Sequence, residues 1–298
     1  MQERPVRERR DMSGFQDVFE RIEVKYLLSR DQYLELRKRL EGYAEIDQYG
    51  LTSILNIYYD TEDYSLVRAS LEKPVYKEKL RLRCYGTPEE DSLSFIEIKK
   101  KYKGVVYKRR TGMAYREAKN YLDGRSLTGP EGQIGSEIEF FRTHYRGLRP
   151  AMVISYDRIA MAGVEDPELR ITFDTNIRWR TRDLDLPLGG QGQEIMDKGQ
   201  VLMELKIAGS VPLELSALFS ELHIYQTSFS KYGKGFEILC GEDPAILMPA
   251  PLPASACTAA PAKSRESRPG GLFRWPDALR PGRLILTGSH GQRAAQLR

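Results

Sequence analysis

Hydrophobic and polar residues alternate over short runs along most of this chain. Eight such runs are rich in β-branched and aromatic residues and are bounded by Gly, Pro or Asp. Alternation with period two is typical of a strand that buries one face. The pattern therefore predicts eight strands, at residues 18–28, 53–61, 76–86, 93–102, 104–115, 151–162, 169–180 and 200–209.

Four helices are predicted between these strands. Ser29 begins an S-x-x-Q capping box with Gln32, and Tyr33, Leu36 and Leu40 follow on one helical face. The other three helices are expected at residues 115–123, 134–146 and 213–223. Strands with few long βαβ crossovers favour an antiparallel sheet. We therefore expect the α+β class, with an antiparallel eight-stranded closed β-barrel and flanking helices.

The polar faces of the strands are dominated by Lys and Arg at period two. Lys79, Arg81 and Arg83 share one face of their strand, opposite Leu80 and Leu82. The same alignment holds on the other strands, for Arg21, Glu23 and Lys25; Glu97, Lys99 and Lys101; Lys108 and Arg110; Tyr156 and Arg158; Arg170, Thr172 and Asp174; and Glu204 and Lys206.

These charged faces have two readings. Each could be an ordinary solvated surface, with the apolar face as the core. However, like charges on neighbouring strands are destabilising, so many such strands in one sheet need a compensating anion. Lys and Arg bind phosphate oxygens, and the interspersed acids offer hard oxygen ligands to a divalent metal. We therefore favour a barrel with this face inward, a charged tunnel for a polyanion.

The net charge adds little to this picture. The segment from residue 249 onward holds eight of the 46 Lys and Arg residues but only two of the 42 acids, so the rest is close to neutral. The basic pI of about 8.8 is then weak evidence for nucleic-acid binding, which we do not expect. We predict a flexible arm at 1–14, a folded domain at 15–240 and a Pro/Ala-rich, basic, disordered tail at 241–298.

Cysteine, histidine and hydropathy patterns limit the classes of protein further. The three cysteines are scattered without a CxxC pair, which favours a reducing, cytoplasmic setting. The three histidines lie far apart, which argues against a zinc site. No apolar run approaches the roughly 18 residues of a membrane-spanning helix. We expect a protein without a transmembrane segment.

Nine short motifs occur in the order found in one known family. They are RIEVKY, YYDT, KLRLRCYG, IEIKKKY, YKRR, SYDR, RITFD, MELK and FSKYGKG. Over residues 15–240 the chain thereby resembles the VTC-type (vacuolar transporter chaperone) polyphosphate polymerase domain. That domain belongs to the triphosphate tunnel metalloenzyme, or CYTH-like, superfamily. The superfamily carries E-x-E-x-K on its first strand, whereas Arg21 gives R-x-E-x-K here, as in polymerase-type members.

The resemblance implies roles for individual residues. The implied catalytic residues are Lys25, Arg81, Arg83, Arg158 and Glu204. The residues implied to bind the triphosphate and polyphosphate are Arg21, Lys99, Lys101, Lys108, Tyr156, Ser230 and Lys231. Glu204 matches the metal-binding acid, for Mn²⁺ or Mg²⁺, and Glu23, Glu97 and Asp174 are further metal ligands or charge balancers.

The implied activity is metal-dependent transfer of the γ-phosphate of a nucleoside triphosphate, expected to be ATP, onto a growing inorganic polyphosphate chain. Two alternatives stay open. The same tunnel could hydrolyse a triphosphate or polyphosphate, with water as the attacking group, or it could bind polyphosphate without catalysis. The oligomeric state is also left open by the sequence.

Overall fold

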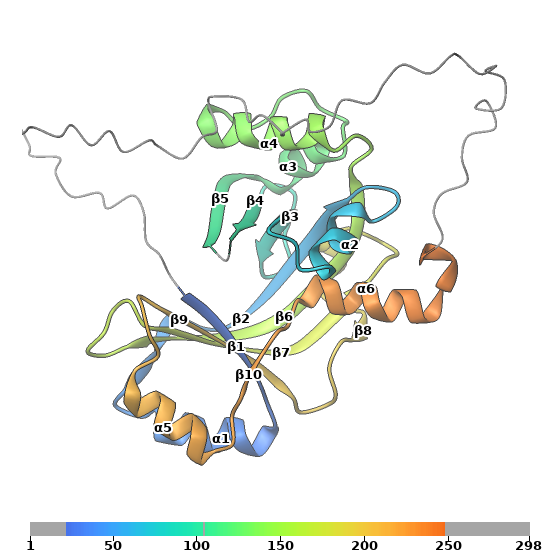
Figure 1. Ribbon diagram of the computed structural model, residues 1–298. Coiled ribbons are helices and arrows are strands. Elements are labelled where there is room, and N and C mark those ends of the chain that lie inside the picture. Colours follow the sequence, from blue (N-terminus) through green and yellow to red (C-terminus); the bar gives the residue numbers. More distant parts are fainter. Residues whose placement is uncertain (1–21, 104, 248–298) are drawn as a thin grey trace, which may run out of the picture. The chain divides into compact units, whose positions relative to one another are not determined.

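A computed structural model describes residues 22–103 and 105–247 (Figure 1). Contacts divide the chain into Met1–Ala250 and Pro251–Arg298, and the described residues all belong to the first unit. The predicted arm at 1–14, Arg21 and most of the predicted tail lie outside the described residues. Regular structure continues past residue 240, because the last helix ends at Glu242 and a 3₁₀ turn, η2, spans Pro244–Leu247.

The core of the fold is one antiparallel sheet with the strand order β10-β1-β9-β7-β6-β2-β3-β4-β5, with β8 added beside β7. All eight predicted strands are present. The strands are β1 (Ile22–Leu28), β2 (Ala44–Asp60), β3 (Tyr76–Tyr85), β4 (Leu93–Tyr102), β5 (Val105–Ala114), β6 (Arg149–Gly163), β7 (Arg170–Arg180), β8 (Gln193–Glu194), β9 (Val201–Ile207) and β10 (Gln226–Thr227).

The prediction of a closed eight-stranded barrel is wrong in two respects. The sheet has ten strands, because β8 and β10 contain only two residues each and are too short to show alternation. The sheet is also not closed by backbone hydrogen bonds in the described part of the chain, where β5 pairs only with β4. Side chains span the gap instead: Lys99 Nζ on β4 lies 3.3 Å from Glu23 Oε2 on β1. The sheet therefore curls around a polar interior.

Helices cover the apolar outer face of this sheet, as predicted. Helices α1 (Arg30–Arg39) and α5 (Leu213–Glu221) pack on the apolar side of β1, β9 and β7. Helices α3 (Tyr115–Leu122) and α4 (Gly132–His144) pack in the same way on β3 and β4. The predicted capping box of α1 is confirmed, since Gln32 N donates to Ser29 Oγ and Ser29 N donates to the Gln32 side chain.

Two helices were not predicted, α2 (Ser65–Leu71) and α6 (Lys231–Glu242). Helix α6 packs on the inner face of the sheet, where Met152 and Ile154 of β6 contact its apolar side. The approach is close: a Cβ added to Gly235 would lie 2.6 Å from Met152 Sδ. The glycines of the G-K-G sequence therefore permit helix packing. This packing fills part of the interior and places the N-terminus of α6 beside the polar residues.

A buried carboxylate joins α2 and α6. Asp60, at the end of β2, accepts hydrogen bonds from Leu66 N at 2.9 Å and Val67 N at 3.0 Å in the first turn of α2. It also accepts one from Tyr232 Oη of α6 at 2.8 Å. The Tyr232 ring stacks on Tyr58 with centroids 4.6 Å apart. Asp60 thus fixes α6 relative to the strand that carries Tyr58.

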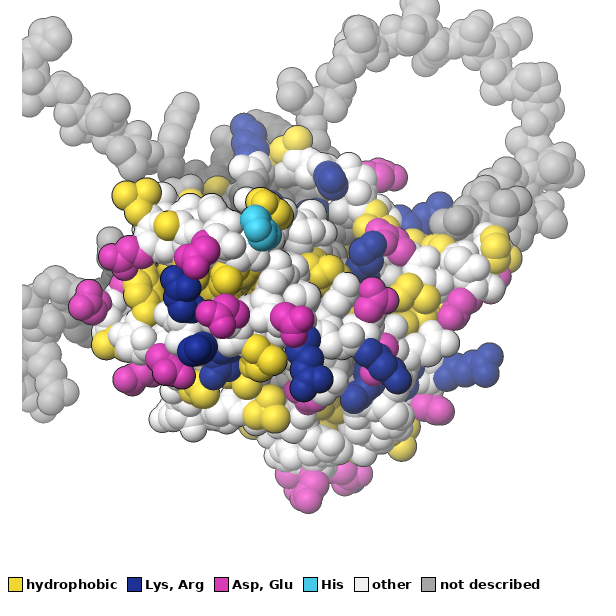
Figure 2. Space-filling view, turned by 90° about the horizontal axis from the view of Figure 1, so that it is seen from below, with side chains coloured by type: hydrophobic (Ala, Val, Ile, Leu, Met, Phe, Trp, Pro, Cys, Tyr) yellow, Lys and Arg dark blue, Asp and Glu magenta, His cyan; other side chains and the backbone are white. Residues whose placement is uncertain are grey.

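The outer surface mixes both signs of charge. Figure 2 views the molecule from below Figure 1, on the side of α1 and α5, and shows Lys and Arg interspersed with Asp and Glu. Arg39 of α1 pairs there with Glu221 of α5 at 3.1 Å. None of the helices in the described residues is long and apolar enough to cross a lipid bilayer. The excess of Lys and Arg over Asp and Glu lies on the inner face instead.

Candidate functional site: a basic face inside the curled sheet

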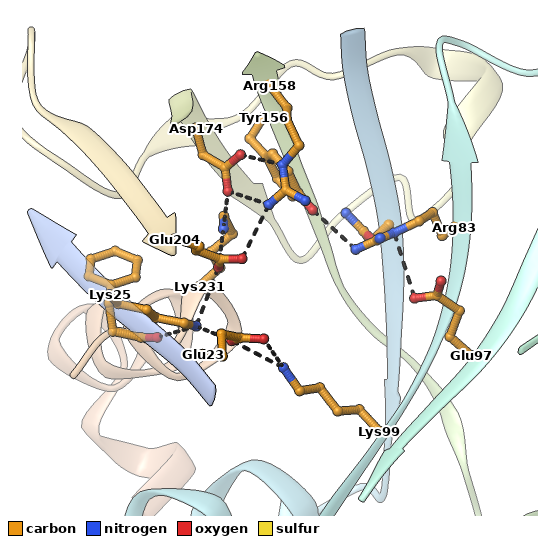
Figure 3. Close-up of polar contacts among 12 residues, drawn as sticks. Glu23, Lys25, Arg83, Glu97, Lys99, Tyr156, Arg158, Asp174, Glu204 and Lys231 are labelled. Carbon is orange, nitrogen blue, oxygen red and sulfur yellow. Dashed lines mark hydrogen bonds and ion pairs between the residues drawn. The ribbon is translucent and has the colours of Figure 1, made fainter. Parts of the chain in front are cut away.

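Strand register places the charged side chains on one common face. Lys25 lies opposite Glu204 across β1 and β9, and Arg158 lies opposite Asp174 across β6 and β7. On the other half of the sheet, Arg81 of β3 lies opposite Glu97 of β4. Because residues directly opposite one another in a ladder share a face, the alternation seen in the sequence brings these groups together. Figure 3 shows Lys25, Glu204, Arg158, Asp174 and Glu97 turned toward a shared interior.

Asp174 is the anchor of the first group. Its carboxylate accepts hydrogen bonds from Arg158 Nε at 2.6 Å and Arg158 Nη2 at 2.7 Å. The same carboxylate accepts one from Lys231 Nζ of α6 at 2.5 Å. Burial raises the pKa of Asp174, but Lys231 and Arg158 outweigh it and hold the pKa below its usual value. Asp174 is therefore a charge balancer that fixes two cations.

Glu204 sits among the same cations but is bound more loosely. Its oxygens lie 3.4 Å from Lys25 Nζ, and 3.5 Å from both Lys231 Nζ and Arg158 Nη2. Its side chain is only 9% exposed. Burial raises its pKa, but Lys231, Lys25 and Arg158 together hold it well below the usual value. Glu204 is thus ionised and retains lone pairs for another partner.

Glu97 anchors the second group on β3, β4 and β5. It pairs with Arg81 at 2.7 Å, with Lys108 at 2.8 Å and with Arg83 at 3.7 Å. Burial raises the pKa of Glu97, but the surrounding cations, Arg81 first, bring it to about 2. Arg83 is further held by Asn56, which accepts from its Nε at 2.9 Å. Glu97 therefore serves as the counter-ion of these three cations.

Two buried tyrosines help to hold Arg81 and Arg83 in place. Tyr58 Oη accepts from Arg81 Nη1 at 3.0 Å, and Tyr156 Oη accepts from Arg83 Nη2 at 3.1 Å. Burial raises the pKa of Tyr156, yet Arg83, Arg158 and Lys231 lower it below its usual value. These contacts hold the guanidinium groups in fixed orientations, which suits binding of a phosphate chain.

A row of three lysines lies beside these groups. Lys79 of β3 is directly opposite Lys99 of β4, which is directly opposite Lys108 of β5. Burial is the main cause that lowers the pKa of Lys79 and of Lys108 to about 8, and neighbouring cations add to it. Like charges in direct opposition are destabilising in a sheet. This arrangement is expected where an anion binds between the strands.

The N-terminus of α6 meets this row. Ser230 caps the helix by accepting from Gly233 N at 3.1 Å, and it also accepts from Lys79 Nζ at 2.9 Å. Within the described residues, Lys79 has no carboxylate partner. The positive end of the helix dipole adds to the attraction for anions at this point.

The structure brings most of the predicted site residues together. Lys101 lies apart, exposed near the end of β4 opposite Lys77, and Arg21 lies outside the described residues. Three residues in the site were not among the predicted ones, namely Lys79, Asn56 and Tyr58. The period-two run Lys79–Arg81–Arg83 carried the signal for Lys79, whereas Asn56 and Tyr58 lie in the strand predicted at 53–61, to which no polar face was assigned.

The acids on this face can be tested for their fit to a divalent metal. The described residues contain no group of three or more His, Cys, Asp or Glu side chains arranged to hold an ion. Glu204 has open lone pairs, and Glu23 is its diagonal neighbour across β1 and β9. Mg²⁺ is commonly held by one or two carboxylates while substrate phosphates supply other ligands. The donor set fits such an ion, and Glu204 and Glu23 are the carboxylates that would hold it.

Comparisons with solved structures give distant similarities. A candidate adenylate cyclase from Bacillus halodurans aligns with a TM-score of 0.44 at 17% identity, covering 71% of this chain and 95% of that one. A candidate adenylyl cyclase from Hippeastrum with a dominant triphosphatase activity gives the same TM-score and identity, covering 71% and 93%.

Comparisons with curated proteins and family models are more specific. Vacuolar transporter chaperone complex subunit 4 of Trypanosoma brucei is 24% identical, covering 78% of this chain and 36% of the relative. The subunit of the same name from Schizosaccharomyces pombe is 23% identical, covering 79% and 39%. The chain thus spans less than two-fifths of the length of these relatives. The model of the VTC domain matches residues 20–240, most of the chain, and the protein belongs to the VTC domain family.

Proposed function

We propose that this protein is a polyphosphate polymerase that transfers the γ-phosphate of a nucleoside triphosphate, ATP in the first instance, onto inorganic polyphosphate. The observation that carries the proposal is the row Lys79, Lys99 and Lys108 beside Arg81 and Arg83. A phosphate chain supplies the regularly spaced negative charges that such a row needs. Membership of the VTC domain family, together with the motif resemblance, favours a polymer as the product.

The reaction requires alignment and charge neutralisation more than covalent chemistry. A terminal oxygen of the polyphosphate chain would attack the γ-phosphorus and form a new P–O bond. The bond from the γ-phosphorus to the β–γ bridging oxygen would break, and ADP would leave with that electron pair. A terminal phosphate is already deprotonated at neutral pH, so this transfer requires no strong general base.

The cations would divide the work according to their contacts. Arg81 and Arg83 are held by Glu97, Tyr58, Asn56 and Tyr156, and would present fixed N–H groups to the equatorial oxygens. Lys25 and Lys231 flank Glu204 and would neutralise the transferred group. Tyr156, Arg158, Lys99, Lys108 and Ser230 would bind the remaining phosphates. Lys101 and Arg21 are also proposed to bind the polyphosphate chain.

Glu204, with Glu23 as a second donor, would hold a divalent metal, Mn²⁺ or Mg²⁺. Such an ion neutralises charge on the triphosphate and orients it. Asp174 and Glu97 would keep their roles as counter-ions to Arg158, Lys231 and Arg81. We further propose a reducing, cytoplasmic location, which the free thiols of Cys84 and Cys240 support.

Product analysis tests the proposal directly. Incubation of the purified protein with ATP and Mn²⁺ should yield ADP and chains that are resolved by size on a gel. Release of inorganic phosphate without chains would show that the protein is a hydrolase. Binding of polyphosphate without any turnover would show a non-catalytic module. Glu221→Gln, on the outer surface, is the control variant because it removes a carboxylate far from the basic face.

A further inference from the structure

The inner face changes character along β3 and β4. On β3 the inward residues run Lys79, Arg81 and Arg83, and the next in the series is Tyr85. On β4, Phe95 lies opposite Arg83. The charged series therefore ends in aromatic residues at one end of the basic face.

The residues at this end form an apolar ledge, defined here as the exposed Tyr85 and Leu93 with the half-buried Phe95. Tyr85 is 48% exposed and Leu93 is 62% exposed, and the Tyr85 and Phe95 rings meet edge to face with centroids 5.9 Å apart. Arg110 of β5 places its guanidinium 4.9 Å from the centre of the Phe95 ring. Because Tyr85 and Leu93 are exposed, they add little to the hydrophobic core, so their position requires another explanation.

The backbone beside the ledge is also open. Gly112 of β5 lies directly opposite Phe95, where the alternation would otherwise place a side chain on the inner face. A Cβ at this position would lie 3.1 Å from the Leu93 side chain and 3.7 Å from Phe95. Glycine thus places no side chain directly opposite Phe95, and Arg110 is the β5 side chain that lies over its ring.

We propose that this ledge binds the nucleobase of the nucleoside triphosphate by stacking. The proposal rests on the proposed function, because it places the base at the end of the triphosphate site. Tyr85 lies two residues, or about 7 Å, beyond Arg83 along the strand. A triphosphate held along Arg81 and Arg83 then directs its nucleoside toward the rings. Stacking accepts every base, because each has a π-face, so the site takes nucleoside triphosphates as a class and binds purines more tightly than pyrimidines.

Two ligands separate this proposal from the proposed function. ATP with a βγ-imido bridge carries both a base and phosphates, whereas inorganic tripolyphosphate carries phosphates alone. Calorimetric titration with Mg²⁺ measures both affinities for the unaltered protein and for Tyr85→Ala/Phe95→Ala. Loss of base stacking should weaken binding of the ATP analogue about tenfold, whereas binding of tripolyphosphate should change by less than about twofold.

Tyr107→Ala is the matched control, because Tyr107 is similarly exposed at 46% but points to the other face of β5. Tyr85→Leu, which keeps an apolar side chain at the end of the strand, shows whether the ring itself is needed and should also weaken the ATP analogue alone. Unchanged affinity for the ATP analogue, or an equal loss for both ligands, would overturn the nucleobase site and leave the proposed function standing. Failure of the unaltered protein to bind either ligand would overturn both proposals.

Discussion

At the scale of single residues, two neighbouring carboxylates differ in how fully they are used. Asp174 accepts three hydrogen bonds of 2.5–2.7 Å from Arg158 and Lys231. Glu204 is surrounded by cations at 3.4–3.5 Å. A buried carboxylate with fixed short contacts is structural, whereas one with long contacts can accept a new ligand at low cost. The acid that would hold a metal is therefore Glu204.

Glu204→Gln is expected to lower turnover in the proposed polymerase reaction by about 100-fold or more, because the amide removes the ionised group proposed to hold the metal while keeping the shape of the side chain. The variant should stay folded, since Lys231 and Arg158 keep their short contacts with Asp174. Turnover of ATP and thermal melting measured side by side test both parts. Glu221→Gln should leave turnover unchanged and alter melting only slightly, because its ion pair with Arg39 is exposed. Full activity in Glu204→Gln would remove Glu204 from the site.

The lysine row predicts a dependence on pH. Lys79 and Lys108 have pKa values lowered to about 8, so both lose protons as the pH rises above 8 in the free protein. A bound polyanion raises these pKa values, so binding above pH 8 must take up protons, and affinity must fall between pH 8 and 9.5. Titration of tripolyphosphate in buffers of different ionisation enthalpy at pH 9 measures the number of protons taken up on binding. Binding without proton uptake would contradict the assignment of Lys79 and Lys108 to an anion site, and Lys79→Met should reduce the number of protons taken up.

The residue pattern allowed the inner face to be predicted, but not the pairs formed on it. Period two places Arg81, Lys99 and Arg158 on one side of their strands, because side chains must alternate. It does not say that Arg81 meets Glu97, or that Arg158 meets Asp174, because pairing depends on register and strand order. Tyr58 and Asn56 were missed for the same reason, since only their neighbours across the sheet show that they hold arginines.

At the scale of elements, α6 determines where Lys231 and Ser230 lie. Gly235→Ala is expected to destabilise the protein by about 1–3 kcal/mol, because the new methyl would meet Met152 Sδ at 2.6 Å and push α6 away from β6. Activity should fall as well, since Lys231 moves with the helix. Gly241→Ala, in the same helix with nothing within 4 Å, should be neutral or slightly stabilising. Denaturant unfolding of both variants tests this, and equal stabilities would contradict the close packing.

The signals for α2 and α6 are weak in the sequence for physical reasons. Helix α6 contains Gly233, Gly235 and Gly241, and glycine lowers helix propensity. Helix α2 has only seven residues, and the side chain of its N-cap residue, Tyr64, makes no capping hydrogen bond. Its first N–H groups are bound by Asp60 of the preceding strand instead. The capping box of α1, by contrast, is local and could be predicted correctly.

At the scale of the whole molecule, the strands were predicted well but their closure was not. Alternation identifies strands and faces, whereas closure depends on the curvature and hydrogen bonding of the ends of the sheet. Here the strands next to the two ends, β4 and β1, are linked through Lys99 and Glu23, so the contact between them is electrostatic. The interior holds an excess of cations, and the ladders of β3, β4 and β5 set three of them, Lys79, Lys99 and Lys108, side by side. Binding of a polyanion would therefore stabilise the folded protein.

The substitution Lys79→Met tests this balance between the stability of the free protein and its binding of an anion. Removal of a largely buried lysine without a carboxylate partner among the described residues should stabilise the free protein by about 1 kcal/mol, or raise its melting temperature by roughly 2–4 °C. The same change should weaken tripolyphosphate binding, so the ligand should raise the melting temperature of the variant less than that of the unaltered protein. Melting curves with and without tripolyphosphate measure both effects. Lys234→Met, an exposed lysine of α6, should alter neither. A less stable Lys79→Met protein with unchanged binding would show that Lys79 is a structural residue and that the inner face is not built for an anion.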